Sequence, residues 1–317
     1  MSLACDTRDM RTPILFLAAC GSHAAVEPDA QSDAHASDAA TALTVIASGQ
    51  RHPGDLAVDR SRVYWIEMDG KAVSAAPLAG GTPVTLASGL KGPHAIVVSG
   101  DELYWTDPAA NDVLHMPSGG GTATSFVTAS LPWDITADAA AIYFADPGTG
   151  NGNVERVATT GGTPTPLASA QWPFALALDA ANIYYTDQAG SVMRASLAGG
   201  TPLPLATGQM KPWGIAVDAT RVYWTDNMAG TVNAVPLAGG ATTVLAMNQS
   251  LPKDIAIDGA NVYWFDFGTA TIMKVSLAGG TPQVVADHQY IETGLVVDAG
   301  YLYWCNSIAG TVLRLAL

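Results

Sequence analysis

One stretch decides the fold: Pro212-Trp213-Gly214-Ile215-Ala216-Val217-Asp218, a three-residue connection, and then Val222-Tyr223-Trp224-Thr225-Asp226. These are two apolar segments of strand length joined by a short polar turn. A third alternating segment, 231–237, follows, and Gly239-Gly240 leads to a fourth at 242–246. Short segments rich in β-branched and aromatic residues, separated by glycine turns, predict antiparallel strands rather than long helices.

The same unit recurs along residues 41–317. Its aromatic pair appears seven times, at 64–65, 104–105, 143–144, 184–185, 223–224, 263–264 and 303–304. Six of the units begin with a proline, spaced by 39 to 41 residues, and Glu292 takes the place of the seventh proline. Four strands in about 40 residues are typical of a propeller blade. The sequence therefore predicts an all-β, seven-bladed β-propeller with four-stranded antiparallel blades.

The two ends of the repeat region predict how the ring closes. After Glu292 only three strand-length segments remain. The missing one lies at the other end, because residues 44–48 match the fourth strand of the next unit, 85–88. Pairing strand 44–48 with the three C-terminal strands would remove two open sheet edges. We expect this strand to complete the last blade.

Composition limits the classes of partner. The chain has 317 residues, of which 49% are hydrophobic and 13% charged, and its formal net charge is −14. Basic residues do not gather into a run that could follow a phosphate backbone, so nucleic acid is not an expected partner. The three cysteines, Cys5, Cys20 and Cys305, do not form a disulfide framework for the repeats. Cys305 is expected to be a buried structural thiol.

The N-terminal segment resembles a bacterial lipoprotein signal. Met10-Arg11-Thr12-Pro13 precedes an apolar run, and Leu17-Ala18-Ala19-Cys20 fits the lipobox, whose cysteine is acylated. The resemblance implies that Cys20 is the lipidation site and that the protein is extracytoplasmic, either anchored in the cell envelope or secreted, with membrane contact only through the lipid. The alternative is that Cys20 is an ordinary residue of a leader. We divide the chain into a signal or vector segment (1–20), a flexible acidic Ala/Ser-rich tether (21–40) and one propeller (41–317).

The repeat itself resembles known propeller families. Tyr223-Trp224-Thr225-Asp226 is similar to the YWTD repeat of lipoprotein receptors, and the segment 212–218 is similar to the NHL-type and streptogramin-lyase-like propellers. The resemblance covers residues 41–317 and implies the architecture. Seven copies, rather than the six of the receptor family, make a receptor-like role doubtful. Function is not carried over with a fold.

Positions that recur in every unit indicate scaffold, and positions that vary indicate a site. The acid that ends the second segment recurs as Asp107, Asp146, Asp187, Asp226 and Asp266, with Glu67 and Asn306 as variants. Such a residue is expected to accept backbone N–H bonds in a turn. The position after each leading proline varies instead: Gly54, His94, Trp133, Phe174, Trp213, Lys253 and Thr293. We call it the variable position.

The variable position begins the innermost strand, so its seven residues are expected at one end of the central channel. The next position holds Asp55, Asp134 and Asp254 in three units, and Trp172, Lys91 and Lys211 lie in the same connections. Together they predict a channel mouth with aromatic walls and a few charges. The candidate binding residues are His94, Trp133, Asp134, Trp172, Phe174, Lys211, Trp213 and Lys253. The aromatic residues could instead plug the channel.

Three kinds of chemistry are compatible with this mouth. A binding or scaffold module for a protein, small-molecule or carbohydrate ligand needs only exposed rings around a concavity. A metal-dependent hydrolase similar to the SMP-30-type lactonases would use Asp55, Asp134 and Asp254 to hold calcium or magnesium. A lyase similar to the streptogramin-inactivating enzymes would use His94 as a base, with His52 near it. We favour the binding module, without a cofactor, and keep the two enzymes as the alternative.

Overall fold

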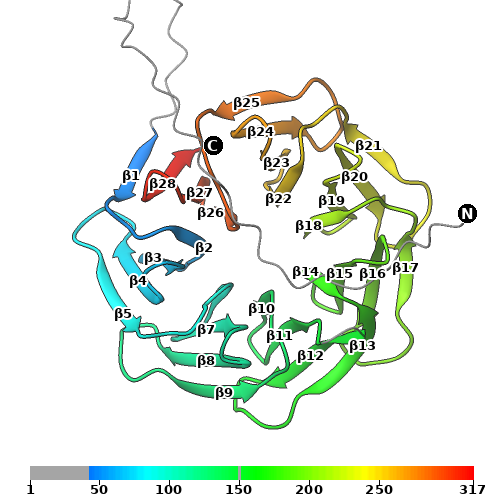
Figure 1. Ribbon diagram of the computed structural model, residues 1–317. Coiled ribbons are helices and arrows are strands. Elements are labelled where there is room, and N and C mark those ends of the chain that lie inside the picture. The colour runs from blue at the N-terminus through cyan, green and yellow to red at the C-terminus, as the bar shows by residue number, and fades with distance from the viewer. Residues whose placement is uncertain (1–42, 149–150) are drawn as a thin grey trace, which may run out of the picture. The chain divides into compact units, whose positions relative to one another are not determined.

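A computed structural model describes residues 43–148 and 151–317. The sequence predictions for residues 1–40, including lipidation at Cys20, lie outside the described residues. Residues 41–317 form one compact unit. All regular secondary structure in the described ranges is β-strand, arranged as seven four-stranded sheets around a central axis (Figure 1). The predicted seven-bladed propeller is confirmed.

The first four blades each contain four consecutive antiparallel strands. Blade 1 consists of β2 (Pro53–Val58), β3 (Arg62–Glu67), β4 (Ala72–Pro77) and β5 (Val84–Ser88). Blade 2 consists of β6 (Ile96–Ser99), β7 (Glu102–Asp107), β8 (Asp112–Pro117) and β9 (Thr124–Thr128). Blade 3 consists of β10 (Ile135–Ala137), β11 (Ala141–Asp146), β12 (Asn151–Ala158) and β13 (Thr165–Gln171). Blade 4 consists of β14 (Pro173–Leu178), β15 (Asn182–Asp187), β16 (Ser191–Ser196) and β17 (Leu203–Ala206).

Two further blades repeat this order, and the seventh closes the ring. Blade 5 consists of β18 (Pro212–Val217), β19 (Arg221–Asp226), β20 (Thr231–Pro236) and β21 (Thr243–Ala246). Blade 6 consists of β22 (Pro252–Ile257), β23 (Asn261–Asp266), β24 (Thr271–Ser276) and β25 (Gln283–Ala286). Blade 7 combines β26 (Leu295–Asp298), β27 (Tyr301–Asn306) and β28 (Thr311–Ala316) with β1 (Thr44–Ala47), which pairs with β28 as predicted.

The hydrophobic core lies between neighbouring blades. The tryptophans of the aromatic pairs, such as Trp65, Trp224 and Trp304, are completely buried. One cluster joins Leu56 and Trp65 of blade 1 to Tyr303 of blade 7, and equivalent clusters lie between other neighbouring blades. Removing a tryptophan side chain from water contributes at most about 4 to 6 kcal/mol. Because each blade is covered by its neighbours, stability depends on the complete ring.

A β-bulge turns the variable position toward the channel. In blade 5, Pro212 pairs with Asp226, but the next pair is Ile215 with Trp224. Two residues, Trp213 and Gly214, therefore lie opposite Thr225 alone. Blades 1, 4 and 6 have the same shift in register at the same place. A bulge redirects side chains out of the regular alternation, and Phe174, Trp213 and Lys253 of blades 4, 5 and 6 face the mouth for this reason.

In blades 1, 2, 3, 5 and 6 the acid that ends the second strand holds the loop that leads into the same blade, whereas Asp187 of blade 4 accepts only from the following turn. Asp226 accepts hydrogen bonds from the N–H groups of Met210 and Lys211, each at 2.9 Å, and a bond from the following turn at Ala229. Asp107 binds Lys91 and Gly92 in the same way. The predicted bonds to a turn are confirmed, and the bonds to the preceding loop are an additional finding. These acids therefore position the loops around the mouth.

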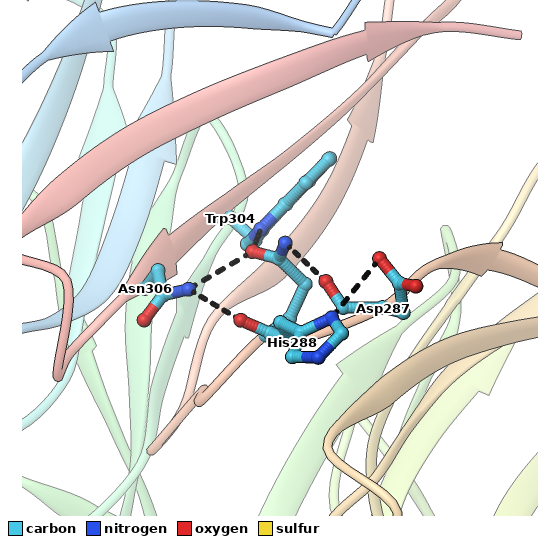
Figure 2. A network of polar contacts seen from close by, with 5 residues as sticks. Asp287, His288, Trp304 and Asn306 are labelled. Carbon is cyan, nitrogen blue, oxygen red and sulfur yellow. Dashed lines mark hydrogen bonds and ion pairs between the residues drawn. The ribbon is translucent and has the colours of Figure 1, made fainter. Parts of the chain in front are cut away.

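In blade 7, amide side chains instead of a carboxylate hold the loop that leads into the blade. Asn306 donates to the His288 carbonyl at 3.1 Å, and the Trp304 indole N–H donates to Gln289 Oε1 at 2.8 Å. Figure 2 shows this network, in which the residues before β26 are tied to β27. An amide can do so because it both donates and accepts.

Neighbouring blades are joined near the channel by one of two side-chain hydrogen bonds. In blades 2, 4 and 5 a threonine hydroxyl donates to a backbone carbonyl of the next blade: Thr106 to Trp133, Thr186 to Trp213 and Thr225 to Lys253. In blades 1, 3 and 6 an inner-strand aspartate accepts from a backbone N–H of the next blade: Asp55 from Ile96, Asp134 from Leu176 and Asp254 from Gly294.

In the described part of the chain, no blade contains both the threonine bond and the aspartate bond. Where the aspartate is present, the threonine position holds Ile66, Ala145 or Phe265. Blade 7 has neither partner, since it carries Gly294 and Cys305. There the strands approach directly: a Cβ on Gly294 would lie 2.7 Å from Asp55 Oδ1. Cys305 is fully buried, as predicted, and burial raises the pKa of its thiol.

Candidate functional site: the channel mouth

All seven blades contribute to a cavity of about 510 Å³ at one end of the channel. It lies where the loops between fourth and first strands meet. Its walls include six residues of the variable position, His94, Trp133, Phe174, Trp213, Lys253 and Thr293. The volume falls within the range of small-molecule pockets, about 300–1,000 Å³. The aromatic side chains therefore line this end of the channel without filling it.

Four rings form a continuous arc along blades 2 to 5. The ring centroids of His94 and Trp133 are 4.0 Å apart, those of Trp133 and Phe174 6.0 Å, and those of Phe174 and Trp213 4.5 Å. The last pair is edge-to-face, with an interplanar angle of 64°. Such contacts fix the orientation of the rings. The arc is a preformed apolar wall on one side of the mouth.

Two lysines converge at the end of the arc. Lys211 Nζ lies 4.6 Å from the centroid of the Trp213 ring, and Lys253 Nζ lies 5.4 Å from the same centroid. Lys253 Nζ is also 4.0 Å from the ring centroid of Phe267. These distances allow cation–π attraction. The arc therefore ends in a local concentration of positive charge.

A second cavity adjoins the first behind Trp213. It has a volume of about 270 Å³ and is lined by Asp187, Gln188, Met210, Lys211 and Pro212 together with Phe174 and Trp213. Because Phe174 and Trp213 line both cavities, this pair of rings separates a main chamber from a side chamber. Lys211 belongs to the side chamber, and Lys253 to the main chamber.

His94 is held in one tautomer. Its Nδ1 lies 3.0 Å from the Trp133 carbonyl, which can only accept, so Nδ1 carries a proton. Burial lowers the pKa of the imidazole to about 4, against smaller raising effects of the Trp133 carbonyl and Glu292. At neutral pH the ring is uncharged, and the Nε2 lone pair carries no proton. Nε2 can therefore accept a proton, but a pKa of about 4 makes this imidazole a weaker base than an ordinary histidine.

The three aspartates Asp55, Asp134 and Asp254 lie in the wall of the main chamber. Burial raises the pKa of Asp134 to about 7 and that of Asp254 to about 6, although each accepts a backbone hydrogen bond that opposes the shift. The pKa of Asp55 is raised by burial and also by repulsion from the other two. Their side chains have a clear structural role, since each joins its blade to the next.

The suggested metal ligands do not form a metal cluster. Within residues 43–148 and 151–317, no group of three or more histidine, cysteine, aspartate or glutamate side chains is arranged to hold an ion. One oxygen of each of the three aspartates accepts a backbone N–H bond from the next blade. The hydrogen bonds between blades explain these acids without a cation.

The rim opposite the aromatic arc is charged. His52 lies 3.5 Å from an oxygen of Asp69 and 3.6 Å from an oxygen of Glu292. Glu292 also lines the main chamber and acts electrostatically on His94 and Lys253. Sequence reasoning did not select Glu292 as a site residue. Its signal was available, because it is the one unit start that is not proline.

The other predicted residues differ in where they lie. Trp172 does not line either of the two chambers, whereas Lys211 lines the side chamber.

Sequence reasoning also missed a group of exposed apolar side chains in the mouth-end loops and turns of blades 5 to 7: Met210, Met228, Met247, Leu251, Phe267, Tyr290 and Ile308. These residues form an exposed apolar surface on one half of the mouth end, where solvated loops usually carry polar side chains.

Comparison with known proteins supports the architecture. No protein-family model matches the chain, and no curated protein matches it in sequence. A virginiamycin B lyase from Staphylococcus aureus is similar in structure, with a TM-score of 0.72, 15% identity, and coverage of 87% of this chain and 98% of the lyase. A gluconolactonase from Xanthomonas campestris has a TM-score of 0.57 and 14% identity, with coverage of 87% and 89%.

A chain of the nidogen–laminin complex is also similar, with a TM-score of 0.52 and 24% identity over 59% of this chain and 76% of that chain. At these identities the similarities establish the fold. They include lyases, a lactonase and a protein from a binding complex, so the fold is shared by proteins of several functions. None of the described residues belongs to a helix that could cross a membrane.

Proposed function

We propose that this protein is a binding module that takes a ligand with a flat apolar face into the channel mouth. The observation that carries the proposal is the arc of His94, Trp133, Phe174 and Trp213 along an open chamber of about 510 Å³. Preformed rings around a concavity lose little conformational entropy on binding. An aromatic ring, a sugar face or a protein side chain has the required shape.

The two tryptophans test this proposal. Trp133→Ala with Trp213→Ala should abolish binding of a ring probe such as indole, measured by saturation-transfer NMR, because both stacking surfaces are lost. The melting temperature should change little, since the backbone carbonyls of both residues still accept the threonine bonds. Trp172→Ala is the matched control, because it removes a loop tryptophan that lines neither chamber.

Two results would contradict the proposal. If the double variant bound indole as well as the parent protein, the arc would not be the binding surface. If it unfolded at much lower temperature while Trp172→Ala did not, the rings would be structural and would serve mainly to support the channel wall.

The second candidate function is a lyase, and the state of His94 favours it. A neutral imidazole with a fixed Nδ1 proton can accept a proton at Nε2. The structural similarity to virginiamycin B lyase adds to this candidate. Incubation with a streptogramin B antibiotic and chromatographic detection of a product tests it. Turnover that is lost in His94→Asn would establish the enzyme. If the antibiotic stayed unchanged, the lyase would be wrong and the binding module would remain the proposed function.

The location of the protein is a separate proposal that rests on the sequence of residues 10–20. We propose that the propeller is held outside the cytoplasm by a lipid on Cys20. Cys20→Ser should release the protein from the membrane fraction of expressing cells. Unchanged fractionation would remove the proposal without affecting the channel mouth.

A further inference from the structure

The positive charge at Trp213 limits the kind of ligand that the mouth can hold. Lys211 precedes β18 and Lys253 lies in β22 of the next blade, yet both ammonium groups lie near one ring, at 4.6 and 5.4 Å from its centroid. Two like charges beside the same ring repel each other in a partly buried site. Burial is the main cause that lowers the pKa of Lys253, and the Lys211 charge lowers it further.

The protein provides no close counterion for either lysine. Among the described residues, every ion pair within 4.0 Å involves a histidine, and neither lysine takes part. Glu292 and Asp254 act on Lys253 from a greater distance and raise its pKa. The carboxyl of Asp187 in the side chamber accepts a hydrogen bond from the Ser191 N–H. The two ammonium groups are therefore available to a bound anion.

From this arrangement we infer that the ligand is an aromatic carboxylate, with its ring on the aromatic arc and its carboxylate between Lys211 and Lys253. The inference rests on the proposed function and gives it a ligand class. The ring would pack in the main chamber against Trp133 and Phe174, and the carboxylate would lie at Trp213, where the two chambers meet. A charge-assisted bond to an ammonium is about twice as strong as a neutral one.

The acids of the chamber do not reverse this preference. Asp55, Asp134 and Asp254 face the same chamber, but each already accepts a backbone N–H bond. The raised pKa values of Asp55 and Asp134 reduce the negative charge of these two side chains near neutral pH, whereas Asp254, with a pKa of about 6, stays mostly ionised there. Asp254 and Glu292, the carboxylates that act on Lys253, are not in salt-bridge contact with it. A ligand carboxylate at Trp213 relieves repulsion between the lysines rather than adding to repulsion among the acids.

Three probes that share one ring test the inference by isothermal titration calorimetry. Indole-3-acetate is the anion, indole-3-acetamide is a neutral molecule of the same shape, and tryptamine is a cation. We expect indole-3-acetate to bind the full-length protein roughly tenfold more tightly than the amide, the factor that corresponds to about 1.4 kcal/mol. Its affinity should fall with added salt, whereas that of the amide should not.

Variants assign the effect to the two lysines. The double variant Lys211→Gln with Lys253→Gln should lose the preference, so that it binds indole-3-acetate no better than the amide. Lys91→Gln is the matched control, because Lys91 lies in the equivalent connection of blade 2 and lines neither chamber. That variant should keep the full preference for the anion.

The possible results separate this inference from the proposed function. Equal affinities for indole-3-acetate and the amide would overturn the ligand class but leave a ring-binding mouth. Tightest binding of tryptamine would overturn it in favour of cation binding at the acids. If none of the three probes bound, both the ring-binding function and the ligand class would be wrong. A preference for the anion that survives in the double variant would show that the lysines are not its cause.

Discussion

Aspartates at the two ends of the inner strand have pKa values shifted in opposite directions, as Asp134 of blade 3 and Asp218 of blade 5 show. Burial raises the pKa of Asp218, but the hydroxyl of Tyr223 and two backbone N–H groups donate to its carboxylate and outweigh burial, so its pKa is lowered. Asp134 is more deeply buried beside other acids, and its pKa rises to about 7. The balance between the depth of burial and the hydrogen bonds to each carboxylate decides the sign.

These two residues predict opposite effects of the same substitution. Asp134→Asn should stabilise the fold at pH 8 by about 1–2 kcal/mol, because the parent carboxyl is ionised there against its burial; the shift from 3.8 to about 7 sets an upper bound of about 4 kcal/mol. The gain should disappear by pH 4, where both proteins are neutral at this position. A raised pKa favours the folded state below the unfolded value, and that contribution is lost as the pH rises through about 7.

Asp218→Asn should instead destabilise the fold at pH 8 by about 1–2 kcal/mol, since the bond from Tyr223 is lost. This cost should shrink as the pH falls below the usual aspartate value of 3.8 and through the lowered folded value. Urea unfolding of the two variants and the parent between pH 3 and 8 measures both effects. Changes that stay the same across this pH range would show that ionisation is not the cause.

A threonine or an aspartate provides the hydrogen bond between the inner strands of neighbouring blades. A threonine donates to the carbonyl of the variable position in the next blade, and an aspartate accepts from an N–H in the same region. Either bond satisfies a backbone group at the start of an inner strand, where the bulge interrupts the regular ladder. This pairing rule accounts for the side chains at both positions in six of the seven blades.

Thr225→Val tests the threonine bond. The hydroxyl accepts from the Gly214 N–H and donates to the Lys253 carbonyl, and valine can do neither. We expect a loss of about 2–3 kcal/mol in the free energy of unfolding, since buried backbone groups lose their partners. Thr242→Val, at an exposed position before β21, is the control and should be neutral. Equal effects of the two substitutions would show that the bond between blades contributes little.

For the propeller as a whole, stability depends on the closure of the ring by β1. Ile46 and Ala47 of this strand are 4% exposed and belong to the cluster that joins blades 7 and 1. Without β1, the edge of β28 and this cluster would face water. The four residues of β1 therefore support the contact between the first and last blades of the repeat.

A chain that begins at Gly49 should consequently unfold at a much lower temperature and aggregate, whereas a chain that begins at Thr41 and retains β1 should behave as a closed ring. Differential scanning calorimetry and size-exclusion chromatography of the two chains compare them directly. An equal melting temperature for both would show that blade 7 is stable with three strands and that closure is not required.

Much of this architecture could be predicted because its signals are local and repeated. The aromatic pairs, the prolines and the glycine turns recur in units of about 40 residues. A unit that departs from the pattern at one position can therefore still be recognised from the others. Even the closing strand was visible, since residues 44–48 match a fourth strand that residues 292–317 lack. Strand period, turn chemistry and the count of units depend on neighbours along the chain, and these are written in the sequence.

The roles of particular side chains were decided by the tertiary structure. Asp55, Asp134 and Asp254 were candidate metal ligands in the sequence, but each binds a backbone N–H of the next blade, about 40 residues away. Lys211 and Lys253 are separated by a whole blade and meet at Trp213, and Glu292 meets His52 across the point where the ring closes. Burial, pKa and charge at the mouth depend on such contacts between blades, which a pattern within one repeat does not contain.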